Sequence, residues 1–122
     1  MSSFFVVLAS MEPVTDTITQ IYERPFRLNG DWEVALTHLQ YDEKLWPLFV
    51  FCDVVEYTYV NGSRMRFLDL VNSTSLRNES PVYVKVVKKR FSSININIRK
   101  DLDYDHLTSQ SGITCVLHFR KV

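Results

Sequence analysis

The chain has 122 residues, a length that fits one domain and can bury a sizeable core without disulfide or metal support. Hydrophobic residues make up 46% of it and charged residues 23%, which excludes disorder over most of the length. Lys plus Arg and Asp plus Glu number 14 each, so no global field would attract nucleic acid or an anionic membrane.

The N-terminal segment contains a short apolar run, F-F-V-V-L-A, at residues 4–9. A secretory signal peptide is the competing interpretation, but no basic residue precedes the run and the run is too short. We therefore expect a first strand at Phe4–Ser10. No segment approaches the apolar length that spans a bilayer, so the sequence predicts neither secretion by this route nor a membrane span.

Blocks of aromatic and β-branched residues then recur between turn signals, which is typical of an all-β protein. The second predicted strand is Thr17–Phe26, in which Ile18, Gln20 and Tyr22 share one face. Pro25 near its end indicates an edge or a bulge, because proline gives the ladder no donor.

The stretch L-N-G-D-W-E-V-A-L-T-H-L-Q-Y at residues 28–41 predicts a tight hairpin at Asn29-Gly30, followed by one long strand. Trp32, Val34 and Leu36 fall on the same face of that strand and would anchor the core. A helix is the competing interpretation, because Trp32, Leu36 and Leu39 also have helical spacing.

Turn signals also divide the rest of the chain into blocks. The block Leu48–Val60 is predicted to be a strand that is buried at its start and exposed to solvent at its end. A hairpin at Asn61-Gly62 leads into a returning strand at Arg64–Val71, with Phe67 and Asp69 on one face and Leu68 on the other. The polar segment Asn72–Ser80 predicts an exposed loop.

The last three predicted strands are Pro81–Val87, Ser93–Arg99 and Ile113–Arg120. Alternation points Val82, Val84 and Val86 inward in the first, and Ile94, Ile96 and Ile98 inward in the second. In the third, the inner residues are Ile113, Cys115, Leu117 and Phe119. Lys88-Lys89-Arg90 is predicted to end the first of these strands, and residues 101–111 are predicted to form a polar loop.

The scheme gives one all-β domain over residues 1–122, with about eight antiparallel strands. Strands in that number most often form two facing sheets, as in a jelly roll or an immunoglobulin-like sandwich, and a closed barrel is the alternative.

No catalytic or cofactor site is expected. His38, His106 and His118 are scattered, and no nucleophile neighbours any of them in a recognisable arrangement. The triplet Asp101, Asp103 and Asp105 copies the first ligands of a calcium loop, but His106 and Gly112 occupy the positions that require glycine and glutamate. Cys52 and Cys115 lack metal-type spacing and are predicted to be buried, reduced thiols.

Two groups of residues are candidates for binding partners. Lys88, Lys89 and Arg90 form a basic run that would contact phosphate if the fold brought it near Arg64 and Arg66. Charges that protect a strand end explain the run equally well. Aromatic residues beyond the needs of a core give a candidate subunit interface, made of Trp46, Tyr57, Tyr59 and Tyr83.

Three stretches resemble segments of one family, the minor capsid (penton) proteins of Polinton or Maverick elements and adintovirus-like DNA viruses. They are residues 28–41, the segment L-F-V-F-C-D-V-V-E at 48–56, and G-I-T-C-V-L-H-F-R-K at 112–121. The family has an "L-x-G-x-W-E-V-A-L" strand near its N-terminus and closes on an "L-H-F-R" strand. The matching residues are Leu28, Gly30, Trp32, Glu33, Val34, Ala35, Leu36, Cys52, Asp53, Val55, Leu117, His118, Phe119 and Arg120.

The resemblance implies a single jelly-roll β-sandwich that assembles with copies of itself and with a major capsid protein. It places the chain in the virion, and in the host cytoplasm or nucleus before assembly. Family members are longer between the first two motifs, where only Asp42–Pro47 stands here.

The function predicted is therefore a non-enzymatic structural one. A β-sandwich module that binds a glycan or a host protein is the first alternative. A nucleic-acid binder built on Lys88–Phe91 is the second.

Overall fold

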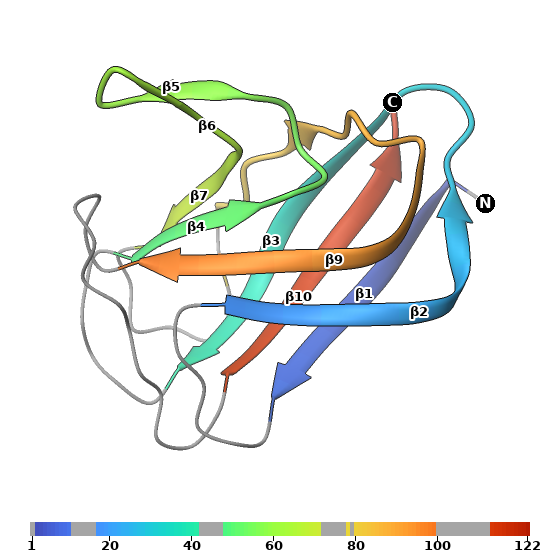
Figure 1. The fold of residues 1–122 in the computed structure, drawn as a ribbon, viewed down its shortest axis with the longest axis horizontal. Helices are drawn as coiled ribbons and strands as arrows, with labels where there is room; N and C mark the ends of the chain where they lie inside the picture. Colours follow the sequence, from blue (N-terminus) through green and yellow to red (C-terminus); the bar gives the residue numbers. More distant parts are fainter. Residues whose placement is uncertain (1, 11–16, 42–47, 72–77, 79, 100–112) are drawn as a thin grey trace.

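The computed structural model of the chain describes residues 2–10, 17–41, 48–71, 78, 80–99 and 113–122 (Figure 1). These residues form ten strands and no helix. The strands are β1 (Ser3–Ser10), β2 (Thr17–Arg27), β3 (Trp32–Tyr41), β4 (Leu48–Cys52), β5 (Thr58–Val60), β6 (Ser63–Met65), β7 (Phe67–Val71), β8 (Val84–Lys85), β9 (Arg90–Arg99) and β10 (Ile113–Lys121). The all-β prediction is confirmed, and the helical alternative at Trp32 is wrong.

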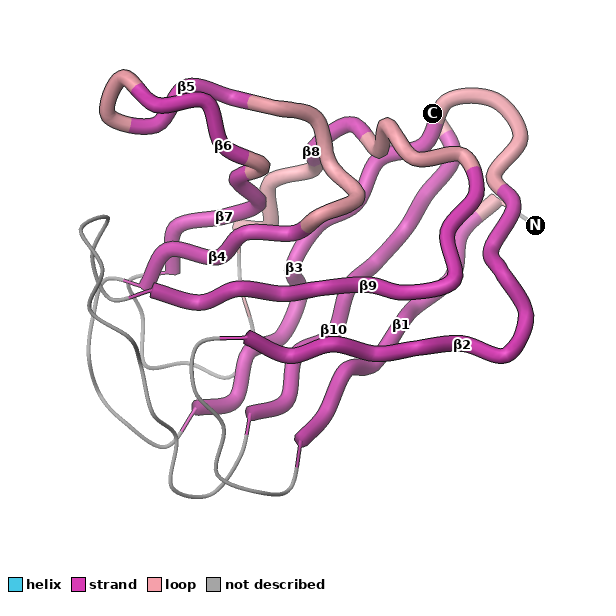
Figure 2. The backbone as a smooth tube through the Cα atoms, in the orientation of Figure 1, coloured by secondary structure: helices cyan, strands magenta, loops and turns pink. Residues whose placement is uncertain are grey.

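The strands are arranged in two layers. One four-stranded sheet has the order β1-β10-β3-β8, the other has the order β2-β9-β4-β7, and β5 pairs with β6 alone. All of these pairings are antiparallel, as predicted. In Figure 1 and Figure 2, β2, β9 and β4 pass in front of β1, β10 and β3.

A single hydrophobic cluster joins the two sheets. Strand β9 contributes Ile94, Ile96 and Ile98, all fully buried, as its strict alternation predicts. Strand β10 contributes alternate residues from the opposite layer, Ile113, Cys115, Leu117 and Phe119. Both sets confirm the predicted inner faces.

Strand β3 supplies the centre of the first sheet. Trp32, Val34 and Leu36 are buried as predicted, and the Trp32 indole Nε1 donates to the Asn29 carbonyl oxygen at 2.9 Å. The register with β10 shifts between Val116 and Leu117, so Leu39 is buried as well as Leu36. A bulge of this kind explains why period-two alternation fails in the second half of the strand.

The hairpin predicted at Asn29-Gly30 is wrong. Strand β2 pairs with β9 and β3 pairs with β10 and β8, so the segment passes from one sheet to the other. Gly30 has a φ of +84°, and a Cβ there would lie 3.0 Å from the Lys121 side chain. The glycine therefore serves this crossing, whereas Asn61 and Gly62, with φ of 50° and 81°, do form the predicted tight hairpin between β5 and β6.

The predicted strands Leu48–Val60 and Arg64–Val71 are each interrupted. Strand β4 ends at Cys52, where a turn begins: the Val55 N–H donates to the Cys52 carbonyl at 3.5 Å, and the Asp53 side chain accepts from the backbone N–H of Asn95. Strand β7 is separated from β6 at Arg66, whose carbonyl accepts from the Cys52 N–H at 3.0 Å. These long-range hydrogen bonds leave no local sequence signal.

The predicted strand Pro81–Val87 shrinks to β8, and Arg90 opens β9 instead of ending the preceding strand. Val86 is buried as predicted, but Val82 is 55% exposed, so its predicted inward orientation is wrong. Asn78 is half-buried and not simply part of an exposed loop, because its backbone N–H donates to the Thr37 carbonyl at 2.8 Å.

Several predictions lie outside the described residues. They concern Trp46, His106, the remainder of the Asn72–Ser80 loop apart from Ser80, and the segment 100–112 with its three aspartates.

Candidate interaction surfaces

The residues that match the capsid-protein motifs mostly form the core. Gly30 is exposed at the crossing between sheets and Asp53 is half-buried at the end of β4, whereas Glu33, His118 and Arg120 lie on the outer face of the first sheet. The remaining motif residues are buried: Leu28, Trp32, Val34, Ala35, Leu36, Cys52, Val55, Leu117 and Phe119. The first and last motifs meet directly, because Val34 of β3 is the register partner of Phe119 of β10.

The outer motif residues are joined by Tyr83 into a connected set, which we call the outer cluster: Glu33, Tyr83, His118 and Arg120. The Arg120 Nε lies 2.5 Å from Glu33 Oε1 and its guanidinium carbon lies 3.4 Å from the centre of the Tyr83 ring. The Tyr83 hydroxyl and His118 Nδ1 are hydrogen-bonded at 2.8 Å. Tyr83, a predicted interface residue, is therefore half-buried, and both its ring and its hydroxyl contact other residues of the outer cluster.

An open groove of about 520 Å³ lies beside the outer cluster. Its walls include Phe5 of β1, His38 of β3 and both partners of the Tyr83–His118 hydrogen bond. The Phe5 ring stacks on the His118 ring with centroids 4.5 Å apart. The groove combines apolar walls with imidazole and phenol groups, a lining suited to a small polar ligand or a peptide side chain.

Tyr57 and Tyr59 are the two other predicted interface residues that the structure describes, and they lie directly before β5 and within it. Tyr59 is 78% exposed, whereas Tyr57 is 46% exposed and covered by two arginines. These tyrosines and Tyr83 do not form one aromatic surface, because Tyr83 belongs to the outer cluster on the first sheet.

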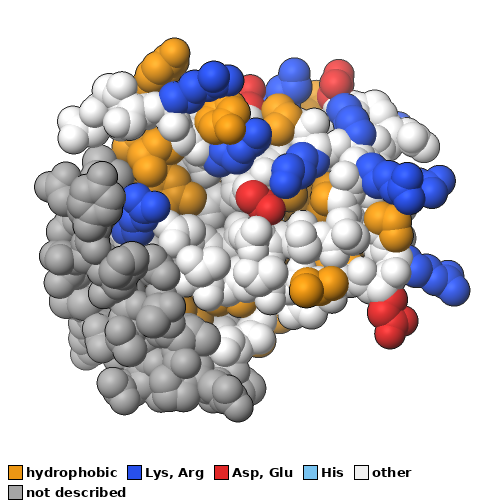
Figure 3. Space-filling model, in the orientation of Figure 1, with side chains coloured by type: hydrophobic (Ala, Val, Ile, Leu, Met, Phe, Trp, Pro, Cys, Tyr) orange, Lys and Arg blue, Asp and Glu red, His pale blue; other side chains and the backbone are white. Residues whose placement is uncertain are grey.

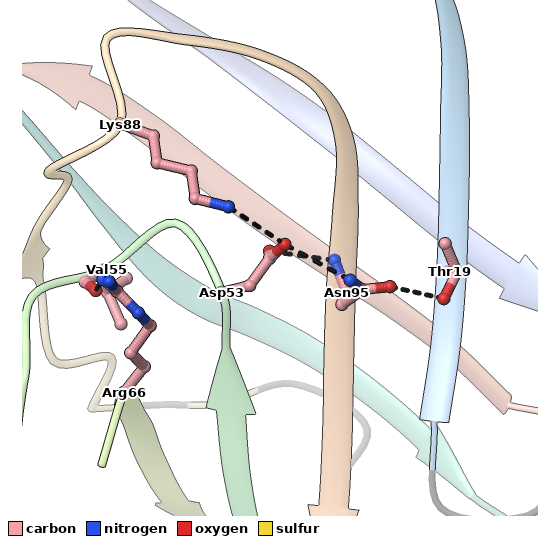
Figure 4. Close-up of polar contacts among 6 residues, drawn as sticks. All are labelled: Thr19, Asp53, Val55, Arg66, Lys88 and Asn95. Carbon is pink, nitrogen blue, oxygen red and sulfur yellow. Dashed lines mark hydrogen bonds and ion pairs between the residues drawn. The ribbon is translucent and has the colours of Figure 1, made fainter. Parts of the chain in front are cut away.

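The basic run Lys88-Lys89-Arg90 is largely engaged within the fold. Lys88 Nζ pairs with Asp53 Oδ2 at 3.4 Å, and Asp53 also accepts from the backbone N–H of Asn95 at 3.0 Å (Figure 4). Lys89 Nζ donates to the Gly30 carbonyl and lies 3.8 Å from Asp31 Oδ1. Lys88 and Lys89 therefore connect the start of β9 to the end of β4 and to the crossing at Gly30, a structural role that differs from the predicted protection of a strand end.

A second basic group was not predicted as a unit. Arg64, Arg66 and Arg99 line one pocket of about 340 Å³ together with Tyr57 and Asn97. The sequence suggests Arg64 and Arg66 as partners of Lys88–Arg90 and predicts Arg99 at the end of a strand, but no local pattern brings that strand end beside Arg64 and Arg66. In Figure 3, Lys and Arg side chains are spread over the upper part and the right side of this face, with acidic and hydrophobic side chains between them.

The edge strands carry exposed apolar side chains. Strand β1 ends the first sheet and exposes 63% of Phe5 and 58% of Val7, while β2 ends the second and exposes 74% of Ile21. The sequence does not predict that these apolar residues are exposed, because the outward-facing positions of a half-buried strand are normally polar in a monomer. Exposed edges with apolar side chains are surfaces on which strands of other chains can add.

Both thiols are buried, although Cys52 borders the pocket lined by Arg64, Arg66 and Arg99. Cys52 and Cys115 are free and buried, as predicted, and burial raises the pKa of each thiol to about 12. Among the described residues, no three His, Cys, Asp or Glu side chains are grouped closely enough to hold a metal ion. No helix in the described part of the chain has the length and apolar character that crossing a membrane requires.

Compared with known proteins, the chain matches no family model, no curated protein and no solved structure.

Proposed function

We propose that the two sheets form a jelly roll. The supporting observation is the pairing of first with last and of second with second-to-last strands: β1 with β10, β2 with β9, β3 with β8, and β4 with β7. The chain is thus one long hairpin, rolled so that β10 lies against β3 and β9 against β4. An immunoglobulin-like sandwich would pair its first two strands in one sheet, and a closed barrel would leave no edge strands.

On this fold we propose a non-enzymatic structural role, as a minor, penton-like component of a viral or virus-derived capsid. The resemblance of residues 28–41, 48–56 and 112–121 to capsid proteins supports the lineage, and the interior positions of β3, β10 and β4 in their sheets agree with framework strands. The proposed partners are copies of the same chain and a major capsid protein.

The exposed edges supply a mechanism for self-assembly. Pairing of β1 with a strand of another copy would extend the first sheet and cover Phe5 and Val7. A two-fold arrangement would bring the same edge of both copies together, and a head-to-tail arrangement would build a ring. Ile21 on β2 offers a second apolar contact of the same kind.

Two measurements test this role. Light scattering after size exclusion should give a mass that rises above the monomer with concentration. Co-expression with a candidate major capsid protein should place the chain in particles purified on a density gradient. A monomer at every concentration that also stays out of particles would reject the proposal.

The groove beside the outer cluster favours a second candidate, a sandwich module that binds a glycan or host protein. Its walls combine Phe5, His38 and Tyr83 in a space large enough for one or two sugar rings. A glycan array separates the two candidates, since saturable binding by a monomer, abolished by Tyr83→Ala, is expected only of the module.

A further inference from the structure

Three arginine side chains line the pocket next to the β5–β6 hairpin and give it a concentrated positive charge. The guanidinium carbons of Arg64 and Arg66 lie 4.1 and 4.0 Å from the centre of the Tyr57 ring. Arg99 joins them from β9, with its guanidinium carbon 5.3 Å from the Phe51 ring centre. We call Arg64, Arg66 and Arg99 the arginine pocket.

Contacts with neighbouring residues restrict each of the three arginine side chains. Arg66 Nη1 donates to the Val55 carbonyl at 2.6 Å, which fixes it at the end of β6. Arg99 Nε donates to Asn97 Oδ1 at 2.7 Å, and the Asn97 amide donates in turn to Thr17 Oγ1. Stacking on Tyr57 restricts Arg64, and a guanidinium on an aromatic face keeps its edge free to bind an anion.

The charge of the three arginines is not balanced inside the described chain. None of them forms an ion pair with a carboxylate among the described residues. The one carboxylate that lines the pocket, Asp53, is paired with Lys88 and hydrogen-bonded to Asn95. Cations that share one ring repel each other, so an external anion would relieve this repulsion.

The number and kind of donors favour phosphate over carboxylate. A single carboxylate is satisfied by one bidentate guanidinium and carries one negative charge. Three guanidiniums around a space of about 340 Å³ instead match a phosphate dianion, or successive phosphodiester groups, which have oxygens pointing in several directions.

We propose that the arginine pocket binds phosphate groups, supplied either by a nucleic-acid backbone or by a free phosphate compound. This proposal does not depend on the capsid role, because it rests only on the geometry of the pocket. It moves the anion-binding surface from the run Lys88–Arg90, which the fold neutralises in part, to Arg64, Arg66 and Arg99.

The test uses the full chain and two phosphate probes. Fluorescence anisotropy with a short labelled oligothymidylate measures nucleic-acid binding across salt concentrations, and the change in melting temperature with inorganic phosphate measures binding of the free ion. A polyglutamate peptide of similar charge is the carboxylate control.

The variant that tests the pocket is the double substitution Arg64→Gln and Arg99→Gln, which keeps Arg66 and its contact with Val55. The matched control is Arg24→Gln with Arg90→Gln, which removes the same charge at exposed sites outside the pocket. Circular dichroism confirms that both variants fold.

With a nucleic-acid source, the pocket variant should bind the oligonucleotide about tenfold more weakly, and the salt slope should fall by about 0.7 for each lost phosphate contact. With a free-phosphate source, only inorganic phosphate should stabilise the chain, and the pocket variant should lose that shift. The proposal is overturned if neither probe binds, if polyglutamate binds as tightly, or if the control variant weakens binding as much.

Discussion

At the scale of single residues, Tyr22 contradicts the usual rule that buried polar groups are paired. Its hydroxyl oxygen is buried without a hydrogen-bond partner among the described residues, and burial raises the pKa of the phenol. The ring itself is well placed, packing edge-on against Phe26 with centroids 4.9 Å apart. The ring therefore stabilises the fold while its hydroxyl destabilises it.

Removing this hydroxyl should stabilise the protein. Tyr22→Phe keeps the ring and its packing, and should raise the free energy of unfolding by about 1 kcal/mol, because an unpaired buried hydroxyl is removed. Tyr59→Phe is the control, since Tyr59 is 78% exposed and its change should stay within about 0.5 kcal/mol. Urea unfolding of both variants measures the difference, and a destabilised Tyr22→Phe would indicate that the hydroxyl has a partner.

Asp69 is a buried carboxylate that holds a neighbouring segment. Its Oδ2 accepts from the Asn78 amide at 2.8 Å and its Oδ1 accepts from the Leu70 N–H at 2.8 Å. The Asn78 amide also donates to the Leu36 carbonyl, so the carboxylate helps to attach this segment to β3. Burial raises the pKa of Asp69 despite these hydrogen bonds, which act in the opposite direction.

The raised pKa of Asp69 predicts a pH dependence with a defined sign. The folded state holds the proton more tightly than the unfolded state, so the stability contributed by this group is complete below the ordinary pKa of 3.8. That contribution declines as the pH rises through the raised folded-state pKa. The free energy of unfolding of the wild type, relative to Asp69→Asn, should therefore fall over this window in urea titrations. A relative gain with rising pH would show that the folded-state pKa is lowered instead.

At the scale of strands, local periodicity predicts an element well only where the tertiary ladder is regular. Ile94, Ile96 and Ile98 were correctly predicted as buried because the ladder of β9 with β2 is regular from Ser93 to Asn97 and its ladder with β4 is regular from Ile96 to Arg99. The inward orientation predicted for Val82 was wrong, and β4 was predicted too long, since a turn starts at Cys52 where the Asp53 carboxylate accepts from the Asn95 N–H. Asp53 and Asn95 are 42 positions apart, and neither residue type marks a strand end by itself.

The Asp53 contact therefore predicts an unequal effect of two neighbouring substitutions. Asp53→Ala leaves the Asn95 N–H without its acceptor at the β4–β9 junction and should lower the free energy of unfolding by about 1–3 kcal/mol. Lys88→Ala removes the ion pair, whose lysine side chain is 42% exposed, and should change it by less than about 1 kcal/mol.

Chemical denaturation of both variants measures the two changes. Equal losses would mean that the ion pair, and not the hydrogen bond to β9, stabilises this junction.

At the scale of the whole molecule, the candidate surfaces are products of the topology. The outer cluster joins Tyr83 to His118, and the arginine pocket joins β6 to the end of β9. Neither group of residues could therefore be predicted from the sequence alone. Single residues were recognised, such as Tyr83 and Arg66, but the residues that complete each site were not. Pairing between strands that are far apart in the sequence is what brings them together.

Strand β1 is terminal in its sheet, and this predicts where self-association can be blocked. Val7 is 58% exposed on that edge, and its replacement by lysine would place a charge where a second copy is expected to pair. Val7→Lys should weaken self-association by about tenfold, equivalent to about 1.4 kcal/mol, as measured by sedimentation equilibrium. The melting temperature should be unchanged, because the side chain is exposed.

Val122→Lys is the control for this edge, since Val122 is 79% exposed at the C-terminus and its charge lies off the β1 edge. It should leave the association constant unchanged. Equal weakening in both variants would mean that added charge, and not the β1 edge, opposes association. If neither variant has an effect, the contact between copies lies elsewhere, and Ile21 on the edge of the second sheet becomes the next position to substitute.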